Sequence, residues 1–390
     1  MENRVKICII GPSKLFLSGI TIYTIRLANA LCETHEVCVL PLRKLMPRFL
    51  YPGRKRIGKP LTKLEFSSSV RAYEGMDYNS LSTWIGAYKF LKKEKPQIIL
   101  VPWWTCAVIH LLLFVKILNK FFIKAKMVLE FHELTHSFEE KISPLRFYSR
   151  LSLALLRRGL DGYIVHSKQD KEYLINFMAK RKGRIAVMPL GLYDHYGAPL
   201  NRKQAKLELK IEEDFVIFYF GIILAHKQVP LIVEAFNKLP ADIIQQSRLL
   251  IAGEVWDKKI DIYKLIRESA YPKKITAILE HPHDDDILKY FSICNVVAMP
   301  YLNISRSAVA TMAMSFGRPI ILIQNGFPGE PVLRYEGNLF VDFGNSTQIT
   351  NRIVEIFLDG RKTYPAPDLK FDKLASRFDN FFESLLVEGK

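Results

Sequence analysis

Residues 6–31 read KICIIGPSKLFLSGITIYTIRLANAL, and this stretch decides the fold class. The short β-branched run over 6–10 predicts a strand buried on both faces, and the longer pattern over 21–31 predicts a helix. The loop between them is neither a G-x-G-x-x-G fingerprint nor a P-loop. Gly19 lies at the expected start of the helix, where backbone N–H groups favour an anion. An ordinary strand-to-helix turn would have the same sequence.

Short strand-like runs continue to alternate with longer helical patterns beyond this stretch. Such alternation predicts right-handed βαβ units and a parallel sheet covered by helices. Further strands are expected at 36–40, 98–101, 127–131, 163–166 and 185–188, and helices at 81–93 and 144–158.

The pattern breaks over residues 192–203, which are polar and rich in turn residues. It restarts with a strand at 215–221, which predicts a second α/β domain after a hinge. Ligands of doubly wound sheets bind outside the carboxyl ends of the strands, so we expect two Rossmann-like domains facing a cleft. The expected division is 1–195, 196–369, and a C-terminal helix in 370–390 that packs back on the first domain.

Positive charge is concentrated in one half of the chain. Residues 1–195 hold 32 Lys+Arg against 15 Asp+Glu, an excess that equals the whole net charge of +17. This asymmetry indicates an anionic partner such as a membrane surface, although net charge also serves solubility. We expect no nucleic acid, because no recognised motif for it is present. The residues expected to face anionic headgroups are Arg43, Lys44, Arg48, Arg54, Lys55, Arg56 and Lys59.

The cysteines and the N-terminus indicate the compartment. Five cysteines without C-x-x-C spacing fit a reducing environment and make a zinc site unlikely. Cys8 and Cys38 lie in strand-like runs and are expected to be core residues. The first residues lead into a strand without the pattern of a signal peptide, so a cytoplasmic protein is expected.

One apolar segment bears on membrane association. Residues 98–115 contain no Asp, Glu, Lys or Arg, which is near the length that spans a bilayer. Pro102 interrupts this run, and four lysines follow between 116 and 126. Three interpretations stay open: a transmembrane span, a helix lying in the membrane interface, and a core helix.

The stretch Glu130-Phe-His-Glu133 ends a predicted strand, where ligand-binding residues lie in such sheets. Three ionisable residues within four positions are costly to bury without partners, so a functional role is expected. Trp103 and Trp104 follow the preceding strand and could stack on a sugar. Adjacent tryptophans also commonly supply core bulk.

In the second half, Lys227 follows the strand at 215–221 and could meet a diphosphate as a point charge. Ser305, Arg306 and Ser307 precede a helix, where a serine is either an ordinary cap or part of a phosphate site. The run His281-Pro-His283-Asp-Asp-Asp286 looks like a metal cluster. Its aspartates lie where a helix needs a cap and a negative first turn, so we interpret it as structural.

Taken in order, these motifs resemble glycosyltransferase family 4, whose members have the GT-B fold. The resemblance covers nearly the whole chain. It rests on Ser18-Gly19-Ile20, Glu130-Phe-His-Glu133, His166-Ser167, Pro189-Leu-Gly191, Gly221 to Lys227, Leu249-Leu-Ile-Ala-Gly-Glu254, Asp285 to Tyr301, Ala313-Met-Ser-Phe-Gly-Arg-Pro319 and Pro328-Gly-Glu330.

The resemblance implies transfer from a nucleoside-diphosphate sugar, usually with retention and without a metal or other cofactor. It places His132 near the transferred sugar, Gly19 beside the donor phosphates and Lys227 on the diphosphate. The acceptor would be a lipid-linked or saccharide molecule at the inner face of a membrane. We assign Ser305, Arg306, Ser307 and Glu330 to the donor side, and Glu130, Glu133, Trp103 and Trp104 to the acceptor side.

The chain departs from the family pattern at three positions. Many members have paired glutamates where this chain has Ile304 and Met312, and an arginine where it has Leu224. Two alternatives therefore stay open: a nucleotide-sugar epimerase of the same fold, and an inactive partner subunit that binds nucleotide sugar or membrane.

Overall fold

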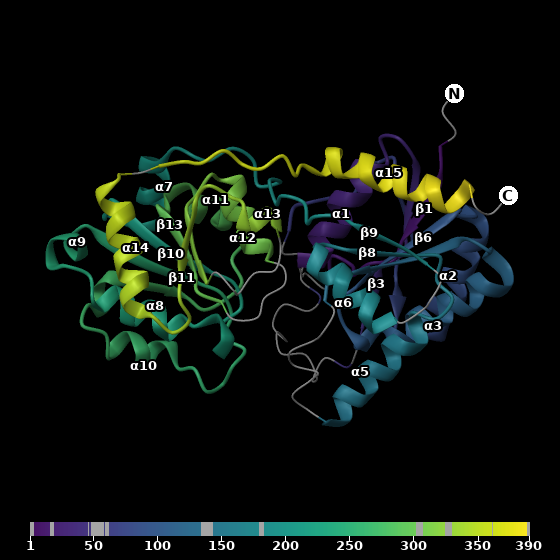
Figure 1. Cartoon of the computed structure of the whole chain (residues 1–390), viewed down its shortest axis with the longest axis horizontal. Coiled ribbons are helices and arrows are strands. Elements are labelled where there is room, and N and C mark those ends of the chain that lie inside the picture. Colours follow the sequence, from purple (N-terminus) through teal and green to yellow (C-terminus); the bar gives the residue numbers. More distant parts are fainter. Residues whose placement is uncertain are drawn as a thin grey trace. The chain divides into compact units, whose positions relative to one another are not determined.

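The computed structural model describes residues 4–15, 19–45, 47, 58, 62–133, 143–178, 183–301, 307–323, 330–360 and 362–387. The chain forms two compact units (Figure 1). The first comprises Met1–Gly191 together with Leu369–Lys390, and the second comprises Leu192–Asp368. The boundary lies after Gly191, whereas the sequence predicted it after residue 195.

The first unit is built on a parallel sheet with the strand order β4-β2-β1-β6-β7-β8-β9. Apart from the seventh strand, this is the doubly wound order in which the chain reverses direction between two neighbouring strands, here β1 and β6. The strands are β1 (Lys6–Ile9), β2 (Glu36–Val39), β4 (Arg71–Ala72), β6 (Ile98–Trp103), β7 (Lys126–Phe131), β8 (Gly162–Val165) and β9 (Arg184–Val187). A separate pair joins β3 (Leu42–Lys44) to β5 (Met76–Asp77).

Helices cover both faces of this sheet because alternate strand residues point to opposite sides. Ile7 and Ile9 pack in a core with helices α1 and α15, whereas Cys8 packs in a second core with α2, α3 and α5. The helices of the unit are α1 (Gly19–Leu31), α2 (Leu81–Glu94), α3 (Ile109–Leu118), α5 (Ser143–Leu156), α6 (Lys168–Met178) and α15 (Phe371–Val387).

The predicted core positions of Cys8 and Cys38 are confirmed, and all five cysteines are buried and free. A hydrogen bond with Cys38 and burial raise the pKa of the Cys8 thiol well above its ordinary value. Such a thiol stays protonated and unreactive.

Strand β6 extends two residues beyond the predicted end at Val101. Proline has no N–H to donate to a ladder, which is why Pro102 argues against a central strand. However, the pairing of β6 with β1 stops at Leu100, and Pro102 pairs only with Glu130 of β7. The missing donor therefore falls beyond the end of the β1 ladder.

The C-terminal helix α15 packs along α1 within the first unit (Figure 1). Phe378 and Phe382 are buried in the core shared with α1 and the sheet. At the surface of this contact, His35 Nε2 lies 2.7 Å from Asp379 Oδ1. Helix α15, the last of the chain, thus covers one face of the sheet that contains β1, the first strand.

The second unit has a parallel sheet with the order β12-β11-β10-β13-β14-β15, the same doubly wound arrangement with its reversal between β10 and β13. Its strands are β10 (Phe215–Phe220), β11 (Ser247–Ala252), β12 (Ile275–Ile278), β13 (Val296–Met299), β14 (Ile320–Ile323) and β15 (Asn338–Val341). Its helices are α7 (Arg202–Leu209), α8 (Val229–Asn237), α9 (Ala241–Gln245), α10 (Ile262–Arg267), α11 (Asp284–Ile293), α12 (Ala308–Ser315), α13 (Glu330–Leu333) and α14 (Ser346–Leu358).

Helix α11 confirms the helical interpretation of the 281–286 run. It begins at Asp284 and carries all three aspartates in its first turn, where they complement the helix dipole. The N-cap residue is His283, and its side chain makes no capping hydrogen bond.

The apolar segment after β6 is helical and only partly buried. Cys106–Ile123 is long and apolar enough to cross a membrane, with a mean hydropathy of 2.0, but 44% of it is buried inside the unit. Leu111, Leu112 and Val115 belong to the core. Ile117, Phe121 and Phe122 are more than half exposed.

Candidate active site

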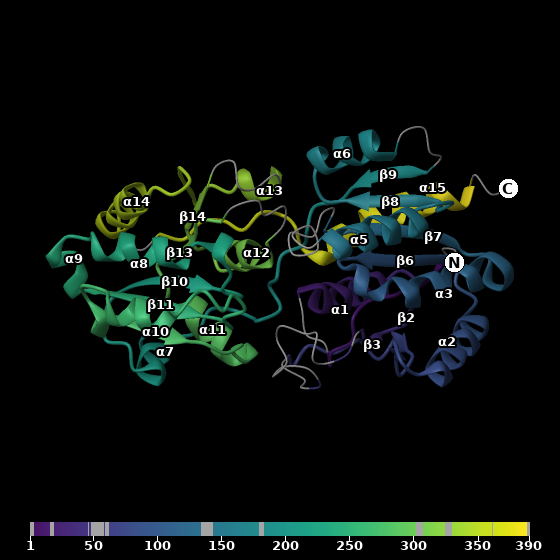
Figure 2. The same cartoon turned by 90° about the horizontal axis from the view of Figure 1, so that it is seen from below.

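The carboxyl end of β7 carries a buried cluster of ionisable residues. Glu130 is fully buried, and His132, just beyond the strand end, is 5% exposed. Glu130 Oε2 lies 3.5 Å from His132 Nε2, and Glu130 Oε1 lies 3.8 Å from His166 Nε2. Two residues of the Glu130–Glu133 segment therefore lie beside a residue that follows the neighbouring strand, β8 (Figure 2).

One side chain and one backbone carbonyl orient this cluster. The Tyr23 hydroxyl of α1 donates to Glu130 Oε1 at 2.5 Å. His166 Nδ1 lies 2.7 Å from the carbonyl oxygen of Met188. Because a carbonyl can only accept, His166 Nδ1 carries a proton, and its Nε2 faces the carboxylate.

The same three side chains are of the kinds that bind divalent cations. The ligand atoms of Glu130, His132 and His166 all lie within 4.8 Å of one another. This possible ligand set was not predicted from the sequence, in which only the cysteines and the 281–286 run were weighed as metal sites. The cluster can hold a proton, orient a hydroxyl group or bind a cation.

The other sequence-predicted residues of the first unit have different settings. Gly19 begins α1 and is exposed. Glu133 is half-buried beside the cluster. Trp103 and Trp104 are 3% and 8% exposed and belong to the hydrophobic core. Of the two interpretations, the core role therefore applies, and the rings offer little surface to a sugar.

In the second unit, the strand ends of β10 and β11 approach each other closely. A Cβ on Gly253 would lie 2.0 Å from the Gly221 carbonyl oxygen, so only glycine fits there. Beyond the two glycines, Ile223 N donates to the Glu254 carbonyl and Trp256 N donates to the Ile223 carbonyl. This bare backbone lies at the carboxyl ends of β10 and β11, the edge of a doubly wound sheet at which ligands bind.

Lys227 lies in this region, half-buried in a short helical turn (Ala225–Lys227). Its Nζ lies 3.9 Å from the ring centroid of Tyr301, which follows β13. Burial raises the pKa of Tyr301, so the ring stays neutral, and its hydroxyl donates to the Phe220 carbonyl at 3.1 Å. Tyr301 thus fixes the ammonium of Lys227 at the ends of β10 and β13 by a cation–π contact.

The start of α12 is described only in part. Ser307 is its N-cap and accepts a hydrogen bond from Ala310 N at 3.3 Å, so this hydroxyl has the ordinary structural role of a cap. Ser305, Arg306 and Ile304 lie outside the described residues. Glu330 begins α13. Met312 is buried in α12, and Leu224 is half-buried at the start of the Lys227 turn.

Sequence reasoning assigned no role in the site to Tyr23, His166 or Tyr301. His166 and Tyr301 each follow a strand, the same signal that selected His132, and both stand in the motifs of the family resemblance. Tyr23 lies in an apolar helix pattern, where a tyrosine is most simply a core residue. Its role depends on which strand lies beneath α1, which the sequence pattern alone does not give.

Comparison with known proteins identifies both units. Residues 17–194 match the family model described as Glycosyltransferase Family 4, and residues 201–366 match the one described as Glycosyl transferases group 1. No curated protein matches the sequence.

Solved structures match nearly the whole length. Sucrose-phosphate synthase from Thermosynechococcus elongatus is 18% identical with a TM-score of 0.72, covering 99% of this chain and 100% of that one. Anabaena HepE in complex with UDP-glucose is 15% identical with a TM-score of 0.66, covering 99% of each chain. WaaG, a glycosyltransferase involved in lipopolysaccharide biosynthesis, is 11% identical with a TM-score of 0.60, covering 96% of this chain and 95% of that one.

These likenesses establish the GT-B fold predicted from the sequence, with two Rossmann-like domains. A glycosyltransferase model matches each domain in turn. The chain is therefore a GT-B glycosyltransferase.

Proposed function

We propose that the protein transfers a sugar from a nucleoside-diphosphate sugar to a lipid-linked or saccharide acceptor, with retention at the anomeric carbon as in family 4. The observation that carries the donor class is Lys227, a cation held over Tyr301 beside the bare backbone of Gly221 and Gly253. A positive charge at the strand ends of a doubly wound sheet suits a diphosphate. UDP-glucose bound to the similar HepE supports this donor class.

In the proposed reaction, Lys227 and the N-terminus of α12 would stabilise the negative charge that develops on the departing nucleoside diphosphate. His132 would position or polarise the sugar from the first unit, which we propose is the acceptor-binding half. Lys227 supplies charge without a metal, so we propose that transfer needs no metal or other cofactor.

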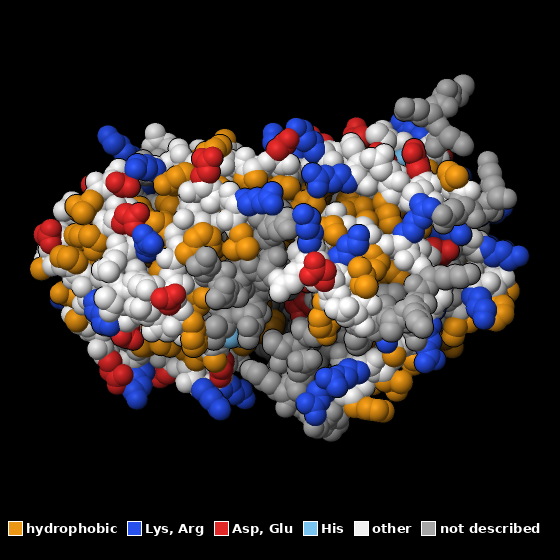
Figure 3. Space-filling view, viewed as in Figure 1, with side chains coloured by type: hydrophobic (Ala, Val, Ile, Leu, Met, Phe, Trp, Pro, Cys, Tyr) orange, Lys and Arg blue, Asp and Glu red, His pale blue; other side chains and the backbone are white. Residues whose placement is uncertain are grey.

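We also propose that the first unit associates with an anionic membrane at the cytoplasmic face. Three exposed apolar side chains, Phe147, Leu151 and Leu155, lie along α5, and Phe121 and Phe122 follow α3, which packs against α5. Arg146 and Arg150 of α5 are exposed among them. Figure 3 shows Lys and Arg side chains next to hydrophobic ones in the region of α5. Apolar side chains rimmed by cations suit a helix that lies in a membrane interface.

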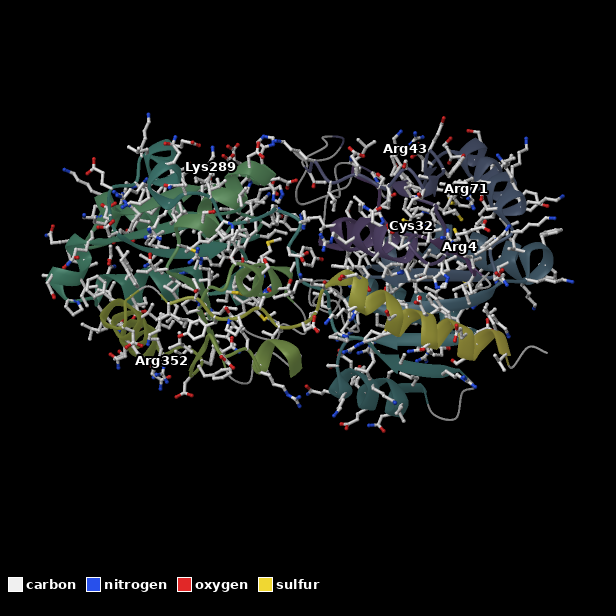
Figure 4. All side chains as sticks on the ribbon, turned by 90° about the horizontal axis from the view of Figure 1, so that it is seen from above. Arg4, Cys32, Arg43, Arg71, Lys289 and Arg352 are labelled. Atoms are coloured by element: carbon white, nitrogen blue, oxygen red, sulfur yellow. The ribbon has the colours of Figure 1, made fainter. Side chains whose placement is uncertain are left out.

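Two of the predicted headgroup-facing residues have carboxylate partners instead. Arg43 makes two hydrogen bonds of 2.9 Å to Asp77, and Lys44 Nζ lies 3.5 Å from the same carboxylate. Arg71 is likewise paired with Glu94 and Glu36; Figure 4 shows Arg43 and Arg71 on one side of the first unit. Arg48, Arg54, Lys55, Arg56 and Lys59 lie outside the described residues. The α5 surface is therefore the better-supported contact.

A ligand screen tests the donor class. We expect one of the UDP, GDP, ADP or dTDP sugars to raise the melting temperature. At a concentration of 100 Kd, the ligand should add about 2.7 kcal/mol to the free energy of unfolding. The active nucleotide sugar is then incubated with and without acceptors. Turnover without any acceptor would support the epimerase alternative, and binding without turnover on any acceptor would support the inactive partner subunit.

Liposome flotation tests the membrane proposal. We expect the wild-type protein to prefer anionic over neutral vesicles at low salt. Arg146→Glu/Arg150→Glu should weaken this binding at least tenfold, since each cation near the surface contributes about 1 kcal/mol. Lys258→Glu/Lys259→Glu, an equal charge change at exposed residues of the second unit, is the matched control. Equal binding to both vesicle types would rule the proposal out.

A further inference from the structure

We propose that Glu130 is a positioning residue that holds His132 with Nε2 toward its carboxylate, so that Nδ1 is the ring nitrogen offered to the sugar. This inference rests on the proposed role of His132 in glycosyl transfer. It assigns to Glu130 a function inside the protein, in place of the acceptor contact expected from sequence.

The first step is the burial of the carboxylate. Glu130 is 0% exposed, and a buried carboxylate is costly unless it is paired and hydrogen-bonded. Tyr23 donates to Oε1 at 2.5 Å from α1. The other oxygen, Oε2, is the one that lies 3.5 Å from His132 Nε2. The carboxylate is thus held on one side by Tyr23 and directed at His132 on the other.

The second step is the orientation of the imidazole. The Tyr23 ring meets the His132 ring edge-on, with centroids 4.5 Å apart. The His166 ring lies 4.6 Å away, and His166 is itself tied to the Met188 carbonyl. The backbone is fixed as well, because His132 N donates to the Trp103 carbonyl at 2.9 Å. Two neighbouring rings and one backbone hydrogen bond thus restrict the plane of the imidazole.

The third step is the tautomer. The 3.5 Å between Glu130 Oε2 and His132 Nε2 is an ion-pair distance, longer than a good hydrogen bond. Because a carboxylate can only accept, we place the proton of His132 on the nitrogen that faces Glu130. In the neutral imidazole, Nδ1 is then the acceptor, suited to receive a hydrogen bond from a sugar hydroxyl. In functional sites, the group that contacts one ring nitrogen of a histidine often determines which nitrogen carries the proton.

The experiment compares wild type, Glu130→Gln and Tyr23→Phe. The amide of glutamine keeps the shape but can donate to His132 Nε2, which removes the preference for the Nε2–H tautomer. We expect the ¹⁵N signals of His132 in wild type to show a protonated Nε2 and an unprotonated Nδ1 when the ring is neutral. In Glu130→Gln the tautomers should mix, and kcat should fall about a hundredfold. Tyr23→Phe should show a smaller change in the same direction.

The KM for the donor separates positioning from a general loss of structure. It should stay within about twofold of wild type, because the proposed nucleotide contacts lie in the second unit around Lys227. Glu94→Gln is the matched control, a largely buried glutamate of the same unit that pairs with Arg71. It should leave both the kcat and the His132 signals unchanged.

Three results would overturn the proposal. The first is an unchanged His132 tautomer in Glu130→Gln. The second is a fall in kcat no larger than that of Glu94→Gln at equal loss of melting temperature. The third is about one equivalent of divalent metal in the isolated protein, with His132 signals that change when a chelator removes it. Because the NMR measurement needs no substrate, it tests the orientation even if no donor or acceptor supports turnover.

Discussion

Lys227→Ala is expected to lower kcat/KM for the donor by about 10²–10³-fold, the usual loss when one group that stabilises transition-state charge is removed. Lys227 is the only Lys or Arg in residues 221–228, since Leu224 stands where many family members have an arginine. Its ammonium is held 3.9 Å above the Tyr301 ring, so it needs little reorganisation to meet a diphosphate. The variant should also lose most of the thermal stabilisation by the nucleotide that stabilises wild type.

Steady-state kinetics and the ligand-dependent melting temperature measure this effect. Lys227→Arg should recover part of the activity, because it keeps the charge but changes its geometry. Lys258→Ala, at an exposed residue of the same unit, controls for loss of net charge. Nucleotide stabilisation of Lys227→Ala equal to that of wild type would place the diphosphate elsewhere.

Most of the fold could be predicted because strands buried on both faces leave unmistakable runs. FVIFYF at β10 is buried at every position, and the prediction placed it within one residue. The elements that escaped prediction lack this signal. Strand β15 has three half-buried residues out of four, and β4 and β5 have two residues each. Their strand conformation depends on pairing with a neighbour more than on their own composition.

The site could be predicted only where chemistry and position coincide in one segment. Glu130 and His132 were found because they end a strand together. Their partners Tyr23 and His166 come from elsewhere in the chain, and only the strand order brings β1, β7 and β8 into one sheet. Trp103 and Trp104 show the opposite case, since they follow a strand but are core residues. A strand end therefore favours a role in the site, but burial decides what the side chain contacts.

Phe382→Ala is expected to lower the free energy of unfolding by about 3–5 kcal/mol, the cost of deleting a fully buried phenylalanine. Phe382 is 0% exposed, and its ring lies 5.7 Å from that of Phe378 in the core shared with α1. A loss of this size is a large part of the stability of an ordinary domain. Denaturant unfolding of the full chain measures it.

Val387→Ala is the matched control, a residue of the same helix that is 73% exposed, and its effect should stay within about 0.5 kcal/mol.

Loss of α15 packing should also disturb the candidate active site. Phe371, the first residue of the helix, lies 5.6 Å from the ring of Tyr23, whose hydroxyl holds Glu130. Phe371→Ala should therefore loosen the Tyr23–Glu130–His132 arrangement and lower kcat at temperatures where the variant is fully folded. Equal unfolding midpoints for Phe382→Ala and Val387→Ala would show that α15 contributes little to the first unit, and the link from the C-terminal helix to the site would fall with it.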